Sequence, residues 1–130
     1  MIDKVAWILI QDQKVLSARS KGKDTFYLPG GKREKGESDE ECLMREIREE
    51  LSVEILSNSI SLVGVFKDQA HGKAEGVEVK MTCYKADYKG DLAVSQEIEE
   101  MRWLGMKDMD IISPVDRQIF RYLYDKGELL

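Results

Sequence analysis

The sequence is poor in proline and cysteine and has no long hydrophobic run, and each of these absences excludes a class of protein. With 2 prolines and 42% hydrophobic residues, the chain does not have the composition of a disordered protein. The 2 cysteines, Cys42 and Cys83, are too few for a disulfide framework and have no zinc-site spacing. The longest hydrophobic run, residues 5–10, is too short to cross a bilayer and too strand-like for a signal-peptide core. We therefore expect a cytoplasmic protein that does not enter a membrane.

Length and charge predict a single acidic domain. The 130 residues compare with about 150 residues per domain, so we expect one domain over residues 1–130. The net charge of −5 disfavours binding to duplex nucleic acid through a basic face. Locally, basic residues are concentrated between Arg19 and Lys35, and a strongly acidic stretch follows. This order suits a site that holds a polyanion beside a metal ion, although a solvated surface could have the same pattern.

Hydrophobic patterning predicts an α/β fold. Strands are expected at residues 5–10, 15–18, 26–28, 60–66, 77–86 and 102–104. A helix is expected at residues 38–51, where Ser38 and Glu41 form a capping-box pattern. A last helix begins at Ser113, with Pro114 at its first helical position. Helices interleaved with a mixed central sheet imply a layered α/β/α sandwich.

Three glutamates on the predicted helix at 38–51 carry the clearest chemical signal. Glu46, Glu49 and Glu50 stand at i, i+3 and i+4, so their side chains project from one side of the helix. Like charges at this spacing repel by about a few tenths of a kcal/mol per pair, which disfavours the grouping unless a cation lies among them. Oxygen ligands at this density suit Mg²⁺ or Mn²⁺ rather than zinc. An ordinary solvated acidic face is the alternative that charge alone leaves open.

The glycine loop before this helix makes the pattern specific. From Gly31 to Val53 the sequence resembles the Nudix box, G-x5-E-x7-R-E-U-x-E-E-x-G-U, where U is a bulky aliphatic residue. Every position matches except Ser52, where the family pattern has glycine. Serine at that helix end puts the local cap geometry in question but removes no ligand. The segments at 28–31 and 97–103 are also similar to this family.

The resemblance implies a Nudix fold and a metal-binding catalytic helix. Glu46, Glu49 and Glu50 match the positions that bind a divalent metal ion, Mg²⁺ or Mn²⁺, and the carbonyl oxygen of Gly31 is expected to join them. Glu49 and Glu50 are also our candidates for direct participation in catalysis.

The resemblance also implies residues that support this helix and that activate water. Glu37 and Arg45 match the positions that orient the catalytic helix. Family members often add a carboxylate from a loop before a late strand, as a metal ligand or general base. We assign that role to Glu97, with Glu100 as the second choice, while a solvated surface glutamate is the alternative.

The implied reaction is hydrolysis of a pyrophosphate bond in a nucleotide. The sequence lacks the proline typical of ADP-ribose hydrolases and the tyrosine typical of dinucleoside-polyphosphate hydrolases, and its spacing before 28–31 is too short for the coenzyme A pattern. By elimination, the chain looks most like the MutT-type enzymes that convert a nucleoside triphosphate to the monophosphate and pyrophosphate. An oxidised purine nucleotide such as 8-oxo-dGTP is a candidate substrate. ADP-ribose, a nucleotide sugar and a non-catalytic nucleotide-sensing role remain alternatives.

Candidate substrate-binding residues lie on both sides of the box. The basic residues that could hold non-reacting phosphate oxygens are Arg19, Lys21, Lys23, Lys32 and Arg33. Phe26 or Tyr27 could stack on a base, or could simply belong to the core. Asp116 could accept a hydrogen bond from a purine edge, or could only complement the dipole of its helix. The single histidine, His71, lies in a polar loop, and exposed edge strands would allow a homodimer.

Overall fold

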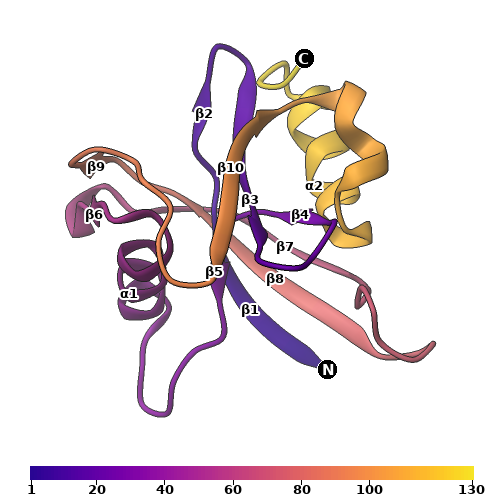
Figure 1. The fold of residues 1–130 in the computed structure, drawn as a ribbon, viewed down its shortest axis with the longest axis horizontal. Helices are drawn as coiled ribbons and strands as arrows, with labels where there is room; N and C mark the ends of the chain where they lie inside the picture. The colour runs from indigo at the N-terminus through magenta and orange to yellow at the C-terminus, as the bar shows by residue number, and fades with distance from the viewer.

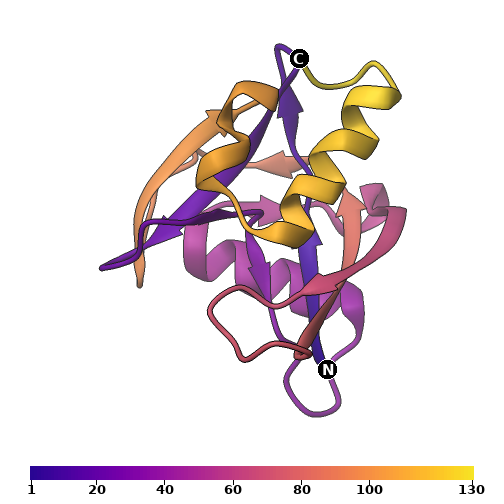
Figure 2. The same ribbon diagram turned by 90° about the vertical axis from the view of Figure 1, so that its right-hand side faces the viewer.

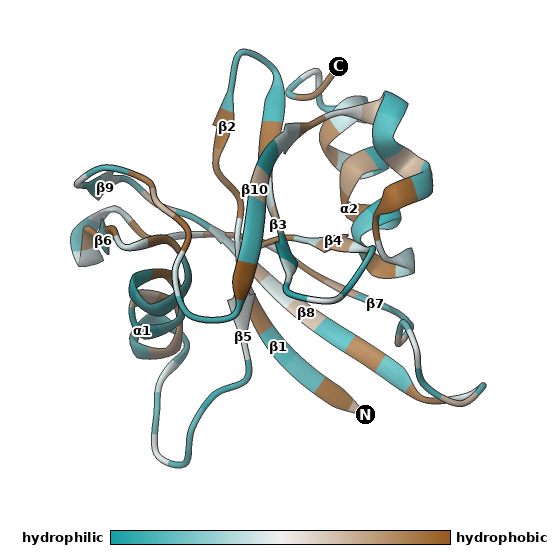
Figure 3. Cartoon of the chain, viewed as in Figure 1, coloured by the Kyte–Doolittle hydropathy of each residue, from teal (hydrophilic) through white to brown (hydrophobic).

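A four-stranded mixed sheet forms the centre of the computed structural model, which describes residues 1–130. Its strand order is β5-β1-β8-β7, in which β1 (Ile2–Trp7) runs parallel to β8 (Glu78–Lys85). The outer strands, β5 (Gly30–Gly31) and β7 (Ser61–Gln69), pair antiparallel with β1 and β8. Hydrophobic and hydrophilic residues alternate along β8, as expected for a strand whose two faces have different surroundings (Figure 3).

A second, antiparallel sheet extends beside the first. It has the order β10-β3-β2, and β4 also pairs with β3. Its strands are β2 (Ile10–Gln11), β3 (Lys14–Ser20), β4 (Phe26–Tyr27) and β10 (Ile98–Leu104). A two-residue turn joins β2 to β3, and both of its residues, Asp12 and Gln13, have positive φ angles, of 52° and 60°. Such turns match the twist of the strands that they connect.

Helix α1 (Asp39–Leu51) covers one face of the mixed sheet (Figure 1). The predicted capping box is confirmed, because Ser38 accepts from the backbone N–H of Glu41 and Glu41 accepts from that of Ser38. The apolar face of α1 packs into a core that also contains Trp7, Leu16 and Ile55. At the helix end Ser52 has φ 63° and ψ 21°. Serine therefore takes the left-handed conformation for which the family pattern provides glycine.

Helix α2 (Pro114–Asp125) lies on the opposite side of the sheets (Figures 1 and 2). Ser113 caps it and Pro114 occupies its first turn, as the sequence predicts. Its buried residues Val115, Ile119, Phe120 and Leu123 form a second hydrophobic core together with residues of β8. The arrangement of helix, sheets and helix confirms the predicted α/β/α sandwich.

The predicted element bounds need several corrections. The first strand was expected at 5–10, but β1 begins at Ile2, and a break after Trp7 separates it from β2. β7 continues to Gln69, into a segment whose polar composition suggests a loop. The sequence pattern missed a short ribbon of β6 (Glu54–Ile55) with β9 (Tyr88–Lys89) and two 3₁₀ segments, η1 (Ser57–Ser59) and η2 (Met106–Ile111). None of the helices has the length and apolar character needed to span a membrane.

Candidate active site

Arg45 is the centre of the ion-pair network that joins the glycine loop to α1. Its guanidinium donates to both carboxylate oxygens of Glu37, at 2.7 and 2.9 Å, and to the carbonyl oxygen of Lys32, at 3.1 Å. It also donates to Glu46 at 2.9 Å and to Glu49 at 3.0 Å. Arg45, together with the backbone N–H of Glu34, lowers the pKa of Glu37 to about 2, so this carboxylate is ionised at neutral pH. A two-point pair of this kind fixes the loop to the helix by geometry as well as by charge.

A second ion-pair network holds the same loop against the central sheet. Arg33 forms ion pairs of 2.6 Å with Asp3 of β1 and with Asp39 at the start of α1. Tyr84 of β8 donates to the other oxygen of Asp39 at 2.7 Å. Because two carboxylates bind its guanidinium, Arg33 holds the loop in position and has no free donor pair to offer to a phosphate.

The loop glycines allow two α1 carboxylates to lie against backbone. A Cβ atom built on Gly31 would lie 2.5 Å from the carboxyl carbon of Glu46, so only glycine leaves room for that group. The backbone N–H of Gly30 donates to Glu50 at 3.3 Å. Burial and the neighbouring charge of Glu46 raise the pKa of Glu50 to about 8. In the absence of a counter-ion, ionisation of both carboxylates at once is therefore unfavourable.

This donor set fits a divalent cation in its chemistry. Glu46, Glu49 and Glu50 supply carboxylate oxygens, and the carbonyl oxygen of Gly31 lies in the same loop as the Glu46 contact. As arranged, the side chains form no three-ligand group, because Glu46 and Glu49 are bonded to Arg45 while Glu50 faces Gly30. A bound cation would stabilise the ionised form of Glu50, which burial and the charge of Glu46 disfavour.

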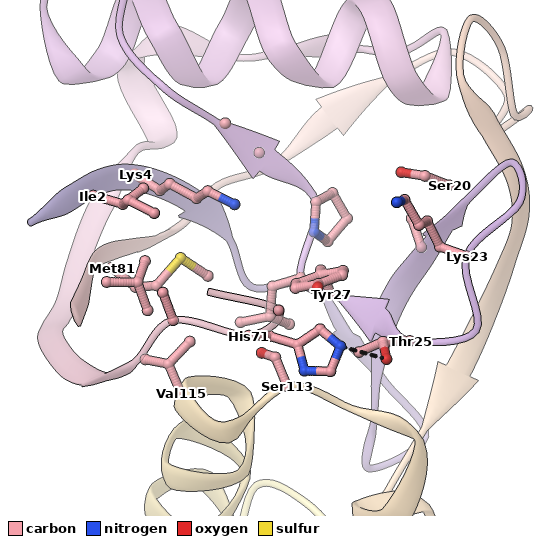
Figure 4. A pocket seen from close by; sticks show the side chains of 18 of the residues that line it. Ile2, Lys4, Ser20, Lys23, Thr25, Tyr27, His71, Met81, Ser113 and Val115 are labelled. Atoms are coloured by element: carbon pink, nitrogen blue, oxygen red, sulfur yellow. Dashed lines mark hydrogen bonds between the residues drawn. The ribbon is translucent and has the colours of Figure 1, made fainter. Parts of the chain in front are cut away.

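A cavity of about 620 Å³ opens beside these carboxylates (Figure 4). Glu50 and the two loop glycines line it on the side of α1, whereas Val115 and Ser113 line it on the side of α2. Its volume is in the range of small-molecule sites. At its mouth a hydrogen bond of 3.1 Å joins His71 Nε2 to Thr25 Oγ1, so two loops meet there.

Of the two candidate aromatic residues, Tyr27 lines the cavity and Phe26 does not. Phe26 is 3% exposed within the core beside α2, and the guanidinium groups of Arg19 and Arg102 lie over its ring. The Tyr27 ring lies in the cavity and makes an edge contact with His71. We therefore correct the assignment of Phe26 as the base-contacting residue, because successive residues of a strand face opposite sides.

Asp116 is fully buried and does not itself line the cavity, although its bonded neighbour Leu28 does. Its Oδ2 atom accepts from the backbone N–H of Leu28 at 2.9 Å, and its Oδ1 atom has no hydrogen-bond partner. Burial raises the pKa of Asp116 to about 7. Asp116 lies in the first turn of α2, where a negative charge complements the helix dipole, and its burial also brings it into contact with the backbone of Leu28.

The basic candidates are placed differently from one another. Arg19 is bound to Glu100 at 3.1 Å and to the carbonyl oxygen of Lys23 at 3.0 Å. Lys21 and Lys32 are exposed, whereas Lys23 lines the cavity. Arg19 therefore already has an anionic partner, whereas the three lysines form no ion pair within the protein.

Of the two candidates for an additional carboxylate, Glu97 is the free one. Glu100 is bound by both Arg19 and Arg102. Glu97 is exposed and has no ion pair, and it lies in the loop that docks on the end of α1. In that loop the N–H of Ser95 donates to the carbonyl oxygen of Glu50 at 3.0 Å. Glu97 therefore lies two residues after a backbone contact with α1.

Sequence reasoning missed Lys4, Lys73 and Met81 as cavity residues. The sequence pattern drew attention to His71 but did not assign it to a site. In the structure His71 lines the cavity, at the mouth where it is bonded to Thr25. Lys4 could have been found from the sequence, because it directly precedes the predicted strand at 5–10. If that strand begins earlier, side-chain alternation places Lys4 on the same face as Ala6, which points into the protein. The two cysteines are free and buried, in agreement with a packing role.

Comparison with known proteins identifies the family. A family model described as the NUDIX domain matches residues 1–123. The NAD-capped RNA hydrolase NudC of Pseudomonas putida (strain W619) is 35% identical over 122 residues, which cover 91% of this chain and 41% of that protein. The uncharacterized Nudix hydrolase YvcI of Bacillus subtilis (strain 168) is 30% identical, with 93% of this chain and 77% of YvcI covered. The chain thus spans about two fifths of the length of its NudC relatives.

Solved structures show the same fold. The E. coli ORF135 protein superposes with a TM-score of 0.74 at 26% identity, over 96% of this chain and 89% of that one. The MutT protein from Methanosarcina mazei Go1 gives a TM-score of 0.76 at 20% identity, with 97% and 94% covered. Nudix hydrolases act on pyrophosphate bonds of nucleotide substrates and use divalent metal ions. The family match, which covers nearly the whole chain, and the intact box carboxylates show that this protein belongs to the Nudix hydrolase family.

Proposed function

We propose that this protein hydrolyses a nucleoside triphosphate to the nucleoside monophosphate and pyrophosphate, with Mg²⁺ or Mn²⁺ as the metal. The observation that carries the proposal is the cavity of about 620 Å³ that begins at Glu50 and the loop glycines and ends beside α2. A space of this size accommodates one nucleoside. Its polar end adjoins the carboxylates, where a polyphosphate chain would lie.

The metal would be held by Glu46, Glu49, Glu50 and the carbonyl oxygen of Gly31. When bound, a divalent ion neutralises charge on the phosphate oxygens and lowers the pKa of a coordinated water. Arg45 and Glu37 keep α1 and the loop in a fixed relation, so the backbone that carries the carboxylates stays in place while Glu46 and Glu49 exchange Arg45 for the metal.

The bond chemistry requires one water molecule and one acceptor for a proton. The water oxygen forms a bond to the phosphorus attached to the nucleoside as the P–O bond between that phosphorus and the leaving pyrophosphate breaks, and the electron pair of that bond stays on the pyrophosphate oxygen. Glu97, or a glutamate of α1, accepts the proton that the water loses. The exposed position of Glu97, free of ion pairs, supports it over Glu100.

The nucleoside would occupy the apolar part of the cavity. Tyr27 offers an aromatic ring, and Met81 and Val115 offer apolar contacts. Asp116, with its unpartnered Oδ1 atom, is our candidate acceptor for a purine edge. An oxidised purine such as 8-oxo-dGTP remains the first base to test.

A dinucleotide pyrophosphate of the NAD type is a second candidate substrate. The similarity to NudC proteins, named as NAD-capped RNA hydrolases, favours it. Lys23 and Lys73 at the cavity mouth could hold the additional phosphate or ribose that lies outside the cavity.

The test is the release of pyrophosphate, phosphate and nucleoside monophosphate from a panel of nucleotides, with Mg²⁺, with Mn²⁺ and with EDTA. The panel contains common and oxidised nucleoside triphosphates, NAD, a short NAD-capped RNA, ADP-ribose and a nucleotide sugar. Metal-dependent release of pyrophosphate from a triphosphate is the expected result. Cleavage of NAD or capped RNA alone would replace the first candidate by the second. A lack of turnover on every substrate would contradict both.

A further inference from the structure

Lys4 is a charged residue on a strand face that otherwise belongs to the hydrophobic core. Because side chains alternate along a strand, Lys4 lies on the same face of β1 as Ile2 and Ala6. Ala6 is a member of the core beside α2, and Ile2 packs against that core. The side chain of Lys4 reaches into the cavity, where Nζ lies 5.6 Å from the centre of the Tyr27 ring (Figure 4).

The ammonium group of Lys4 has no bonded anionic partner in the protein. Carboxylates on both sides act on it through space, Asp116 from α2 and Glu46 and Glu50 from α1, but none of them forms an ion pair or a hydrogen bond with it. Lys32 adds a second positive charge nearby. Withdrawal of an ammonium group and its three donors from water is costly unless a partner is supplied. An anion that enters the cavity would supply that partner.

The position of Lys4 along the cavity indicates which part of a ligand it meets. Glu50 and the loop glycines line the cavity on the side of α1. Val115 lies at the end beside α2. Lys4 projects between these two ends. In a nucleotide that spans the cavity, the phosphate attached to the nucleoside lies between the base and the rest of the polyphosphate chain.

We propose that Lys4 is a substrate-binding residue that holds the phosphate attached to the nucleoside, the one that remains in the monophosphate product. This inference rests on the proposed function, since it assumes that the polyphosphate lies beside Glu50. Lysine presents a compact charge and rotatable donors to the non-bridging oxygens of that phosphate. Charge on these oxygens changes as the bond to the leaving pyrophosphate breaks, so Lys4 contributes to catalysis as well as to binding.

A purely structural role for Lys4 makes a different prediction. If the lysine only offset the negative charge of Glu46 and Glu50, its removal would destabilise the metal-free protein and leave nucleotide affinity unchanged. If it contacted the base instead of the phosphate, its removal would affect some bases much more than others.

The experiment compares Lys4→Met with Lys80→Met. Methionine keeps the unbranched aliphatic chain of lysine and removes its charge. Lys80 lies on β8 next to Met81 but does not line the cavity, so its substitution controls for the loss of one positive charge near β1. The measurements are kcat/KM for triphosphates of several bases, the Mg²⁺ concentration that gives half-maximal rate, and calorimetric binding of nucleoside monophosphates.

For Lys4→Met we expect kcat/KM to fall about 10- to 100-fold, the range that loss of one hydrogen bond to a charged group produces. The factor should be similar for every base, and monophosphate binding should weaken in parallel. The Mg²⁺ requirement should not increase, and Lys80→Met should behave as wild type.

Unchanged monophosphate affinity in Lys4→Met would overturn the inference, and so would a loss confined to one base. Calorimetry also separates the two proposals, because it reports on Lys4 even if the wild-type protein hydrolyses none of the triphosphates. If Lys4→Met does not fold, Lys4→Gln is measured in the same way and is judged by the same criteria.

Discussion

The guanidinium of Arg45 forms two hydrogen bonds to the carboxylate of Glu37, from Nε at 2.7 Å and from Nη2 at 2.9 Å. Glu37 belongs to the loop and Arg45 to α1, so this pair decides where the loop stands relative to the carboxylates. A lysine could keep the charge but not the planar two-point geometry.

Substitution of Arg45 by lysine should therefore reduce activity with little change in fold. We expect kcat/KM to fall about 10- to 100-fold, because one or two charge-assisted hydrogen bonds to the loop are lost. Steady-state kinetics and circular dichroism measure the two effects. Arg48→Lys, on the exposed side of the same helix, is the matched control and should retain wild-type rates. Equal effects of the two variants would contradict the positioning role of Arg45.

Gly31→Ala should weaken metal binding because the new methyl group would occupy the place of the Glu46 carboxylate, 2.5 Å from its carboxyl carbon. Glu46 would have to turn away, and the donor set would lose one ligand. We expect a rise of about tenfold or more in the Mg²⁺ concentration needed for half-maximal activity, as for the loss of about 1.4 kcal/mol of binding free energy. Titration of activity with Mg²⁺ measures this. A normal Mg²⁺ requirement in the variant would show that Glu46 is not a ligand.

Glu50→Gln should abolish most activity and leave the fold intact. Burial and the charge of Glu46 already disfavour the ionised form of Glu50, since they raise its pKa to about 8. The neutral amide of glutamine should therefore not destabilise the protein in EDTA, because it cannot take the negative charge that Glu46 disfavours at this position. Wild-type Tm should rise when Mg²⁺ is added, because a ligand that binds only the folded state stabilises it. The variant should show a smaller rise, and wild-type turnover by it would remove Glu50 from the catalytic site.

The parts of this site that could be predicted from the sequence are those that depend only on neighbouring residues in one helix or loop. The spacing of Glu46, Glu49 and Glu50 and the cap at Ser38 are fixed by a helix of known period, so both could be derived without coordinates. The choice between Phe26 and Tyr27 depended on which face of β4 meets the cavity. That choice depends on the bridge between Phe26 and Ile112, a contact between distant segments.

Lys4 and Asp116 were harder to predict for the same reason. Their surroundings arise only when β1, β4 and α2 come together around the cavity. The sequence contains a lysine beside an apolar strand and an aspartate in the first turn of a helix, and both are ordinary surface patterns. Burial, which changes their chemistry, is a property of the assembled layers.

The last prediction concerns Asp116 and the pH dependence of stability. Burial raises the pKa of this carboxyl group from its ordinary value of 3.8 to about 7, against the opposing effects of Leu28, Lys4 and Ser113. Between these two values the folded state binds a proton that the unfolded state has released. The free energy of unfolding must therefore decrease as the pH rises through this interval, since the slope follows the protons bound in the unfolded state minus those bound in the folded state. The stabilisation is complete below about pH 4 and is lost as the pH rises through about 7.

Asp116→Asn should remove this contribution, because the amide is neutral at every pH and its oxygen can still accept from the N–H of Leu28. The rise of the Asp116 pKa from 3.8 to about 7 corresponds to a change of at most about 4 kcal/mol in the free energy of unfolding. Urea unfolding at pH 5 and pH 8 measures the effect, as the difference between the variant and the wild type at each pH. We expect the variant to gain stability relative to wild type as the pH rises. Asp125→Asn, an exposed position on the same helix, should keep the wild-type pH dependence. A parallel pH profile for Asp116→Asn and wild type would mean that Asp116 is ionised in the folded protein, with Lys4 as the counter-charge that holds it so.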